Sequence, residues 1–211
     1  VEQFSVDSRD LVVDIGGNDG TQLFQYIKLG ITNVANVESA KNIAEISSQR
    51  GIFTINRFFN EETVKKSFAE GAAKIINAAG VFFHLEELHS VTSGIKKLLH
   101  KDGIFIVQFL YMKSIVDNNA FDQIYHEHLL YYTLSTISTL LALHDLEIED
   151  AFLAPIHGGS MICYVKHKQK CRPTQRLLSL RKSEETSHIN EYASYLEFAK
   201  RIEEFKDRDL K

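Results

Sequence analysis

Cysteine and proline are scarce in this sequence, which contains two of each among 211 residues. So few cysteines exclude a disulfide-stapled scaffold, and two prolines exclude a proline-rich linker protein. Cys163 and Cys171 lie too far apart for a CxxC redox or zinc motif. No apolar run approaches the ~20 residues that a membrane-spanning helix requires. What is left is an ordinary globular chain, long enough to bury ~70% of its unfolded surface without a metal or a disulfide.

An excess of basic residues is also lacking, because 24 Lys and Arg stand against 28 Asp and Glu, for a formal net charge of −4. Such a chain has no electrostatic footprint for nucleic acid, so a small molecule or a protein is the expected partner. The first residues, Val1–Asp7, show neither the basic region nor the apolar region of a signal peptide, and we expect a cytoplasmic protein. The first residue is Val rather than Met, which leaves a preceding segment open.

Short apolar runs alternate with helix-compatible segments through the first 110 residues. Strands are predicted at 11–15, 33–38, 52–55, 74–79 and 104–109, and helices at 21–29, 39–50, 61–70 and 84–100. Strict alternation of strand and helix with short turns is typical of a parallel, doubly wound α/β sheet. Right-handed crossovers then place the carboxyl ends of all five strands at one edge, where ligands bind in such sheets.

The pattern changes after residue 110. Residues 111–132 are irregular, long for a loop and rich in Tyr, His and Asn, which favours a functional loop over a disordered one. A helix is predicted at 134–146, followed by strands at 147–153 and 160–167. The short connection between these two strands cannot hold a helical crossover, so they must form a hairpin and one of them must be antiparallel.

Residues 174–211 are polar and charged, and from residue 189 onward the apolar positions have one-sided helical spacing. One or two helices are predicted there. Their apolar face requires a partner, which is the domain itself, another subunit or a part of the chain outside this sequence. The predicted organisation is therefore a globular domain at 1–170, followed at 171–211 by a helical tail that offers a surface for a partner or by a linker to a further C-terminal module.

The turn after the first predicted strand has the composition of a cofactor-binding turn. Asp14 lies near the strand end, and Gly16, Gly17 and Gly20 follow before a helix starts. Glycines let the backbone pass close to a ligand where a Cβ atom would collide, and the helix N-terminus offers free N–H groups to an anionic part of it. The alternative is a tight turn without a ligand, which requires only one or two glycines. Three glycines flanked by carboxylates favour a ligand.

The identity of that ligand depends on what the turn lacks. The dinucleotide fingerprint G-x-G-x-x-G is not met, because Asn18 and Thr21 stand at the second and third glycine positions counted from Gly16. Glu38, at the end of the second predicted strand, suits a ribose diol in either a dinucleotide or an adenosyl cofactor. The Asp14 carboxylate would repel a pyrophosphate but suits a ligand with an ammonium and a sulfonium group. S-adenosylmethionine carries both and is the predicted cofactor.

Two further stretches carry a resemblance to a known family. Residues 121–128 read Phe-Asp-Gln-Ile-Tyr-His-Glu-His, and residues 157–160 read His-Gly-Gly-Ser. With the glycine turn at 12–21, they resemble the S-adenosylmethionine-dependent sugar C-methyltransferases, which methylate C3 of nucleotide-linked 4-keto-deoxysugars. The resemblance covers about residues 10–167. It implies a Rossmann-like, seven-stranded methyltransferase sheet with an antiparallel last strand, in agreement with the strands predicted above, and a nucleotide sugar as the acceptor.

The resemblance also implies which residues contact the cofactor. They lie at or after the ends of the first four predicted strands: Asp14, Gly16, Gly17, Asn18, Gly20, Glu38, Phe59, Asn60 and Ala79. In this set, Glu38 would hold the ribose hydroxyls, and Phe59 and Asn60 would lie by the adenine.

A second set corresponds to the family's catalytic residues. His128 stands at the position proposed as the base, and Tyr125, Glu127 and His84 stand at positions that contact the substrate or support the base. C-methylation next to a ketone requires removal of a proton from carbon, and imidazole, with an ordinary pKa of ~6.5, suits that task near neutral pH. Glu127 would fix the tautomer of the base, and Tyr125 or His84 would donate to the enolate oxygen. This chemistry requires no metal. A His-Glu-His run starting at His126 could instead be a zinc site, but it has neither helical ligand spacing nor the H-E-x-x-H pattern, so no metal site is predicted.

The chain departs from this family in several places. Family members carry an N-terminal zinc-binding module with paired cysteines and a C-terminal α/β module, and this sequence contains neither. Gly80 stands where the family has Asn, Ser39 where it has Pro, and Ile162 where it has Arg. These departures affect the acceptor more than the cofactor. Two alternatives therefore stay open: methylation of oxygen or nitrogen on another small molecule, and a cofactor-binding module without turnover.

Overall fold

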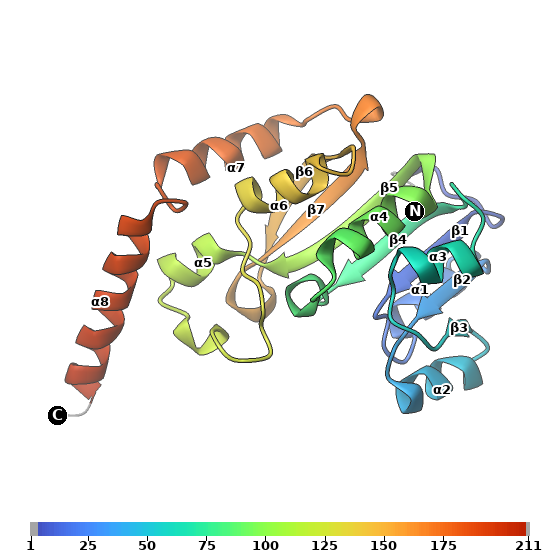
Figure 1. Ribbon diagram of the computed structural model, residues 1–211, viewed down its shortest axis with the longest axis horizontal. Coiled ribbons are helices and arrows are strands. Elements are labelled where there is room, and N and C mark those ends of the chain that lie inside the picture. Colours follow the sequence, from blue (N-terminus) through green and yellow to red (C-terminus); the bar gives the residue numbers. More distant parts are fainter. Residues whose placement is uncertain (1–3, 210–211) are drawn as a thin grey trace.

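The computed structural model describes residues 4–209 and contains a seven-stranded sheet with the order β3-β2-β1-β4-β5-β7-β6 (Figure 1). The strands are β1 (Leu11–Ile15), β2 (Val34–Val37), β3 (Phe53–Ile55), β4 (Ala73–Ala79), β5 (Leu99–Leu110), β6 (Leu146–Ala154) and β7 (Ser160–His167). Neighbouring strands are parallel except at β7, which runs antiparallel to both β5 and β6. The doubly wound sheet, the hairpin and the antiparallel last strand are confirmed.

Helices flank this sheet. They are α1 (Thr21–Lys28), α2 (Lys41–Gln49), α3 (Glu61–Ser67), α4 (Leu88–Leu98), α5 (Met112–Asp117), α6 (Leu134–Ala142), α7 (Gln175–Thr186) and α8 (Tyr192–Asp209). Three predicted boundaries are wrong by four or more residues. The helix predicted at 84–100 begins at Leu88, after a 3-10 turn at Phe82–His84, and β5 begins at Leu99. The helix predicted at 134–146 ends at Ala142, because β6 already begins at Leu146. The short helix α5 lies inside the segment whose composition predicts an irregular loop.

Two hydrophobic clusters cover the two faces of the sheet, because successive side chains along a strand point to opposite faces. The larger cluster contains Ile76 of β4 and Phe105 of β5, packed with Ile95 of α4 and Ile137 of α6. The smaller cluster contains alternate residues of the same strands together with Leu23 of α1. Burial on both faces explains why the predicted strands are almost continuously apolar.

The two C-terminal helices differ in how much of each contacts the rest of the domain. Leu177 of α7 and Ile189 beyond it are buried in the larger cluster, and α7 packs on β6. The last helix, α8, extends away from the sheet (Figure 1). Phe198 of α8 joins the larger cluster, whereas Tyr192 and Leu196 are exposed. The domain itself therefore covers the apolar face of α7, and α8 retains exposed apolar residues.

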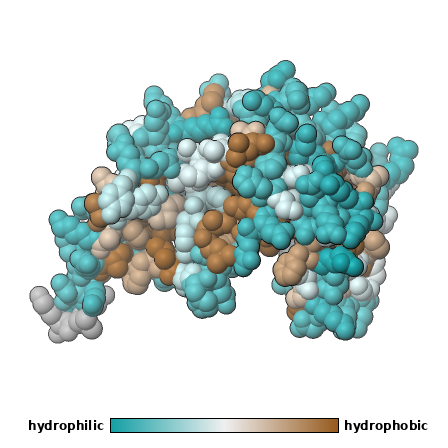
Figure 2. Space-filling view, viewed as in Figure 1, coloured by the Kyte–Doolittle hydropathy of each residue, from teal (hydrophilic) through white to brown (hydrophobic). Residues whose placement is uncertain are grey.

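The segment after α5, residues 118–133, is called the aromatic loop below. Its exposed apolar residues are Phe121, Ile124, Tyr125 and Leu129. Figure 2 shows hydrophobic surface gathered over α5 and this loop. Within residues 4–209, no helix is both long and apolar enough to cross a membrane.

Candidate active site

The candidate site begins at the carboxyl ends of β1 and β4, where the order of the strands in the sheet reverses. Such a reversal opens a crevice at the edge of a parallel sheet, because the connections leave toward opposite faces. β1 ends at Ile15 and continues into the turn at 16–20, which leads into α1. β4 ends at Ala79, which is exposed at the same edge. The predicted cofactor residues of these two strands therefore share one edge.

Asp14 is a buried carboxylate that lacks a partner. It is 2% exposed, and its Oδ2 atom has no hydrogen bond within residues 4–209. Two buried amides, Asn36 of β2 and Asn77 of β4, lie beside it in register. Burial, with a smaller contribution from the charge of Glu38, raises the pKa of the Asp14 carboxyl to about 7. A cationic group beside Oδ2 would supply both the missing hydrogen bond and the missing charge, so the site fits a ligand with an ammonium group.

Side chains from β2 and its end hold the glycine turn in place. The Gly17 N–H donates to Asn36 Oδ1 at 3.1 Å, and Asn36 Nδ2 donates to the Asn18 carbonyl at 2.8 Å. The Asn18 N–H donates to Glu38 Oε2 at 3.1 Å, and the Ala40 N–H donates to Glu38 Oε1 at 2.8 Å. The structure thus brings the predicted Glu38 next to the turn. It also adds Asn36, whose signal in the sequence is a polar residue inside an apolar strand.

The glycines of this turn are required by packing inside the protein. Gly16 and Gly20 have φ angles of 61° and 80°, in the left-handed region. A Cβ atom on Gly16 would lie 2.8 Å from Val81 Cγ1, and one on Gly20 would lie 2.3 Å from Ile52 Cδ1. A Cβ atom on Gly17 would lie 2.6 Å from the amide oxygen described above. The close approach that the glycine pattern predicts therefore exists, but its partners are side chains of this chain.

A cavity of about 300 Å³ lies between the starts of α3 and α4. It is lined by Phe58, Phe59, Asn60, His84, Leu85, Glu86, Glu87 and Val91. Phe59 is buried, and Asn60 caps α3 by accepting the Thr63 N–H at 2.9 Å. Phe58 is 76% exposed. The cavity brings the predicted adenine residues together with His84 and adds Phe58, an aromatic neighbour that sequence reasoning missed.

Two histidines from separate segments lie close together at this edge. The rings of His84, after β4, and His128, in the aromatic loop, have centres 5.2 Å apart. His84 Nδ1 lies 2.6 Å from the Glu127 carbonyl oxygen, and His128 Nδ1 lies 2.8 Å from the Gln123 carbonyl oxygen. A carbonyl oxygen only accepts, so these partners assign the hydrogen of each neutral ring to Nδ1. Nε2 then has a free lone pair and is the nitrogen that can take a proton.

Aromatic rings enclose His128. The side chain is 9% exposed, and its ring centre lies 4.0 Å from that of Tyr125 and 4.7 Å from that of Phe83. His84 is exposed next to this group. The predicted residues His128, Tyr125 and His84 therefore form one cluster.

The carboxylate of Glu127 orients neither histidine. Its side chain is 66% exposed, and the contact described for it within residues 4–209 is with Nε2 of His126, 4.0 Å away. Only the backbone carbonyl of Glu127 reaches His84. The prediction that Glu127 fixes the tautomer of the base is therefore corrected, because the Gln123 carbonyl does so for His128. A main-chain acceptor leaves no pattern in a sequence, which is why sequence reasoning missed it.

The segment 81–84 connects the glycine turn to the aromatic loop. Val81 packs close to Gly16, as described above. Two residues later, the Phe83 carbonyl accepts the Leu129 N–H at 2.9 Å. The turn and the histidine cluster therefore lie at the same edge of the sheet, as expected for a loop that follows β5.

Comparison with known proteins identifies relatives. Residues 155–211 match the family model of the C-methyltransferase C-terminal domain, so the expectation that this sequence contains no part of the family's C-terminal module is corrected. The chain is also 34% identical over 165 residues to the C-methyltransferase NovU of Streptomyces niveus. That alignment covers 78% of this chain and 39% of NovU, so the chain spans about two fifths of the length of this relative.

Solved structures of methyltransferases share the fold. A SAM-dependent methyltransferase from Aquifex aeolicus has a TM-score of 0.58 at 12% identity, over 78% of this chain and 85% of that chain. The geranyl diphosphate C-methyltransferase from Streptomyces coelicolor A3(2) has a TM-score of 0.60 at 11% identity, over 77% of this chain and 74% of that chain. At such low identities, the likeness shows the fold alone.

Proposed function

We propose that this chain is a member of the S-adenosylmethionine-dependent C-methyltransferases and carries the core that transfers a methyl group from S-adenosylmethionine to a carbon atom of a small molecule, and its similarity to C-methyltransferases supports this. The observation that carries this proposal is the buried Asp14 carboxylate, whose Oδ2 is unpaired within residues 4–209 just before the glycine turn. The cofactor has an ammonium group, which supplies what this carboxylate lacks. The pyrophosphate of NAD would instead meet a like charge.

Each part of the cofactor has a proposed partner. S-adenosylmethionine supplies an electrophilic methyl group on a sulfonium. We assign Asp14 to its amino group and Glu38, at the end of the neighbouring strand, to its ribose hydroxyls. The cavity beside Phe59 and Asn60 supports the assignment of these residues to the adenine. Ala79 ends β4 with a small exposed side chain, and we assign it to the same edge as the glycine turn.

The base is assigned to Nε2 of His128. Its Nδ1 hydrogen is held by the Gln123 carbonyl, so the ring is oriented before it takes a proton and the imidazolium is stabilised afterwards. The proton leaves the carbon next to a ketone, the electron pair forms an enolate, and this carbon then takes the methyl group. Tyr125 donates to the enolate oxygen, because Nε2 of His84 donates only when that ring is protonated.

The acceptor class proposed is a nucleotide-linked 4-keto-deoxysugar. The support is the resemblance of residues 121–128 to enzymes that methylate such sugars, together with their place beside the histidine cluster. Exposed Phe121 and Tyr125 suit the partly apolar face of a deoxysugar ring.

Calorimetric titration with S-adenosylhomocysteine tests the cofactor assignment. We expect one site with micromolar affinity, about −8 kcal/mol, and no binding heat with NAD. The physical reason is the carboxylate at Asp14, which attracts the amino group of one ligand and repels the pyrophosphate of the other. Micromolar binding of NAD without binding of S-adenosylhomocysteine would contradict the assignment.

The pH dependence of that binding follows from Asp14. An ammonium group requires the carboxylate form, and a pKa of about 7 means that half of the Asp14 side chains are protonated at that pH. As the pH falls below 7, we expect the affinity to fall, approaching about tenfold per pH unit, whereas an ordinary carboxyl group would cause no such loss until about pH 4. Titrations across this range, in two buffers of different ionisation enthalpy, report the affinity and the proton released. Asp14→Asn should bind more weakly and with a flat profile; a wild-type profile that is itself flat would refute the role.

A further inference from the structure

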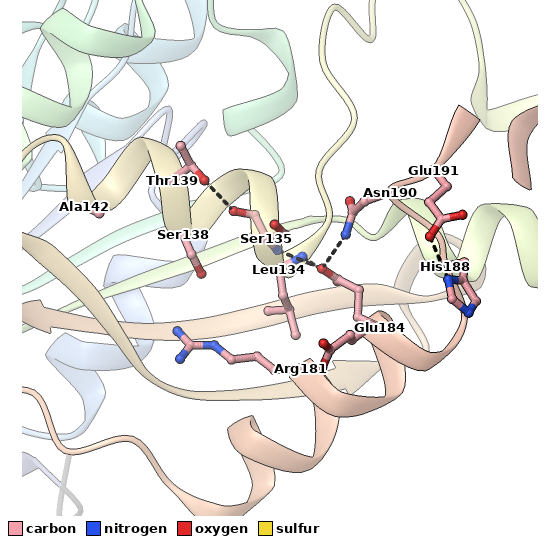
Figure 3. Close-up of a pocket in the computed structure, with 11 residues that line it drawn as sticks. Leu134, Ser135, Ser138, Thr139, Ala142, Arg181, Glu184, His188, Asn190 and Glu191 are labelled. Atoms are coloured by element: carbon pink, nitrogen blue, oxygen red, sulfur yellow. Dashed lines mark hydrogen bonds and ion pairs between the residues drawn. The ribbon is translucent and has the colours of Figure 1, made fainter. Parts of the chain in front are cut away.

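A buried carboxylate on α7 accepts hydrogen bonds from several segments. Glu184 is 3% exposed and lies in a groove of about 650 Å³ between α6 and α7 (Figure 3). Its Oε2 atom accepts the Tyr111 hydroxyl at 2.8 Å and the Leu134 N–H at 2.7 Å. Its Oε1 atom accepts the Ser135 N–H at 2.8 Å and Asn190 Nδ2 at 3.3 Å. Both carboxylate oxygens are therefore fully used.

The donors mark both ends of one functional segment. Tyr111 directly follows β5, and Leu134 is the first residue of α6. Between them lie α5 and the aromatic loop, with His128 and Tyr125. The ends also meet each other, because the Met112 N–H donates to the Tyr132 carbonyl at 2.9 Å. One side chain from α7 thus holds the start and the end of the segment that carries the proposed base.

The chemistry of these contacts makes them strong. Leu134 and Ser135 are at the N-terminus of α6, where free N–H groups and the helix dipole favour a negative charge. Burial raises the pKa of the Tyr111 hydroxyl far above its ordinary value, and the Glu184 carboxylate adds to that shift. The hydroxyl therefore stays protonated and keeps donating. Hydrogen bonds to a buried charged acceptor are about twice as strong as neutral ones.

A second contact from the C-terminal helices holds the middle of residues 111–134. Arg201 of α8 donates from Nη2 to the Val116 carbonyl and from Nε to Asn119 Oδ1, each at 2.9 Å. Val116 is in the last turn of α5, and Asn119 has a left-handed φ of 51°. The guanidinium thus fixes the point where the chain leaves α5 and enters the aromatic loop.

We propose that Glu184 is a positioning residue, which places the aromatic loop and its histidine against the cofactor edge by clamping both ends of residues 111–134. The C-terminal helices, which match the C-methyltransferase C-terminal family model, then act on the acceptor half of the site. The catalytic consequence rests on the proposed function; the clamp itself does not.

Glu184→Gln tests the clamp, with Glu185→Gln as the matched control. Glutamine keeps the shape but has one acceptor oxygen, and its NH₂ group would face N–H donors. Glu185 is exposed and borders the same groove.

Hydrogen–deuterium exchange on this chain measures the effect of the two variants. We expect amides of 118–133 to exchange at least about tenfold faster in Glu184→Gln than in wild type, and at the wild-type rate in the control. Amides of β1 and β4 should keep their protection. S-adenosylhomocysteine affinity should stay within about twofold, while kcat falls and the KM for S-adenosylmethionine does not change.

Tyr111→Phe is the second variant, because it frees only the start of the segment and leaves the α6 end bonded. We expect a smaller rise in exchange, confined to the same residues. Unchanged exchange of the aromatic loop in Glu184→Gln would overturn the proposal. So would a uniform rise over the whole chain, which would mark Glu184 as a general stabilising residue. If wild type fails to bind S-adenosylhomocysteine but the loop responds as expected, the proposed function fails and the clamp stands.

Discussion

Replacing His128 by Asn should lower the rate of methyl transfer by a factor of ~10² to 10⁴, which is the range for loss of general acid–base help. The amide of Asn can still donate to the Gln123 carbonyl, so the loop keeps its anchor, but the variant has no nitrogen that takes a proton. Cofactor affinity should stay within about twofold, because His128 is not part of the glycine turn.

Exchange of the proton next to the ketone isolates this step from methyl transfer. It is followed in deuterated water with a 4-keto nucleotide sugar, with S-adenosylhomocysteine bound so that no methyl group is available. His126→Asn is the matched control, because that side chain is 90% exposed and lies two residues away. It should exchange like wild type. If His128→Asn also exchanges like wild type, His128 is not the base, and His84, whose Nδ1 likewise faces a carbonyl and leaves the lone pair on Nε2, is the next candidate.

Replacing Gly16 by Val should abolish detectable binding of S-adenosylhomocysteine, a loss of at least ~100-fold or about 2.7 kcal/mol. A β-branched residue at a φ of 61° is strained by roughly 1–3 kcal/mol. Its Cβ would also lie 2.8 Å from Val81 Cγ1 and displace the segment that leads to His84. Both effects act on the edge where the cofactor is proposed to bind, so affinity should be lost while circular dichroism still reports a folded chain.

Gly71→Val separates backbone strain from the loss of the site. Gly71 has a φ of 66°, and an added Cβ there would meet no atom within 4 Å among the residues described. It precedes β4, at the edge opposite the glycine turn. We expect a lowered midpoint of thermal unfolding but wild-type binding of S-adenosylhomocysteine. Equal loss of binding in the two variants would show that strain alone weakens the protein, and wild-type binding by Gly16→Val would remove the turn from the cofactor site.

The fold could be predicted where a local pattern decides the structure. The apolar run at β1 and its glycine turn are readable because burial on both faces and a left-handed backbone leave few alternatives. The hairpin of β6 and β7 follows from the length of its connection. The start of β5 could not be predicted, because Leu99 pairs with Ala73 of β4 but the polar residues 100–103 have no strand-like composition, and the pairing resumes only at Ile104 after a register shift. Helix α5 could not be predicted either, since six residues are too few to show a helical period.

The site was predictable only where side chains carry the chemistry. Asp14, Glu38 and His128 stand out by residue type and position. Gln123 contributes a main-chain carbonyl, which any residue has. Glu184 lies in a charged stretch that resembles a solvated helix face, and its burial depends on α6 and Tyr111, which come from distant parts of the chain. Long-range contacts of this kind have no signature in a single sequence.

His84 and His128 both donate from Nδ1 to main-chain carbonyls, and this limits which changes of sequence the histidine cluster can tolerate. Among the residues described, main-chain carbonyls select the tautomers of His84 and His128, so substitutions of the side chains at 123 and 127 leave both tautomers intact. The constraint falls instead on the path of the backbone. An inserted or deleted residue between 123 and 128 would turn the carbonyls away from both rings. Related chains should therefore tolerate many residue types at these two positions and no change in the length of the segment.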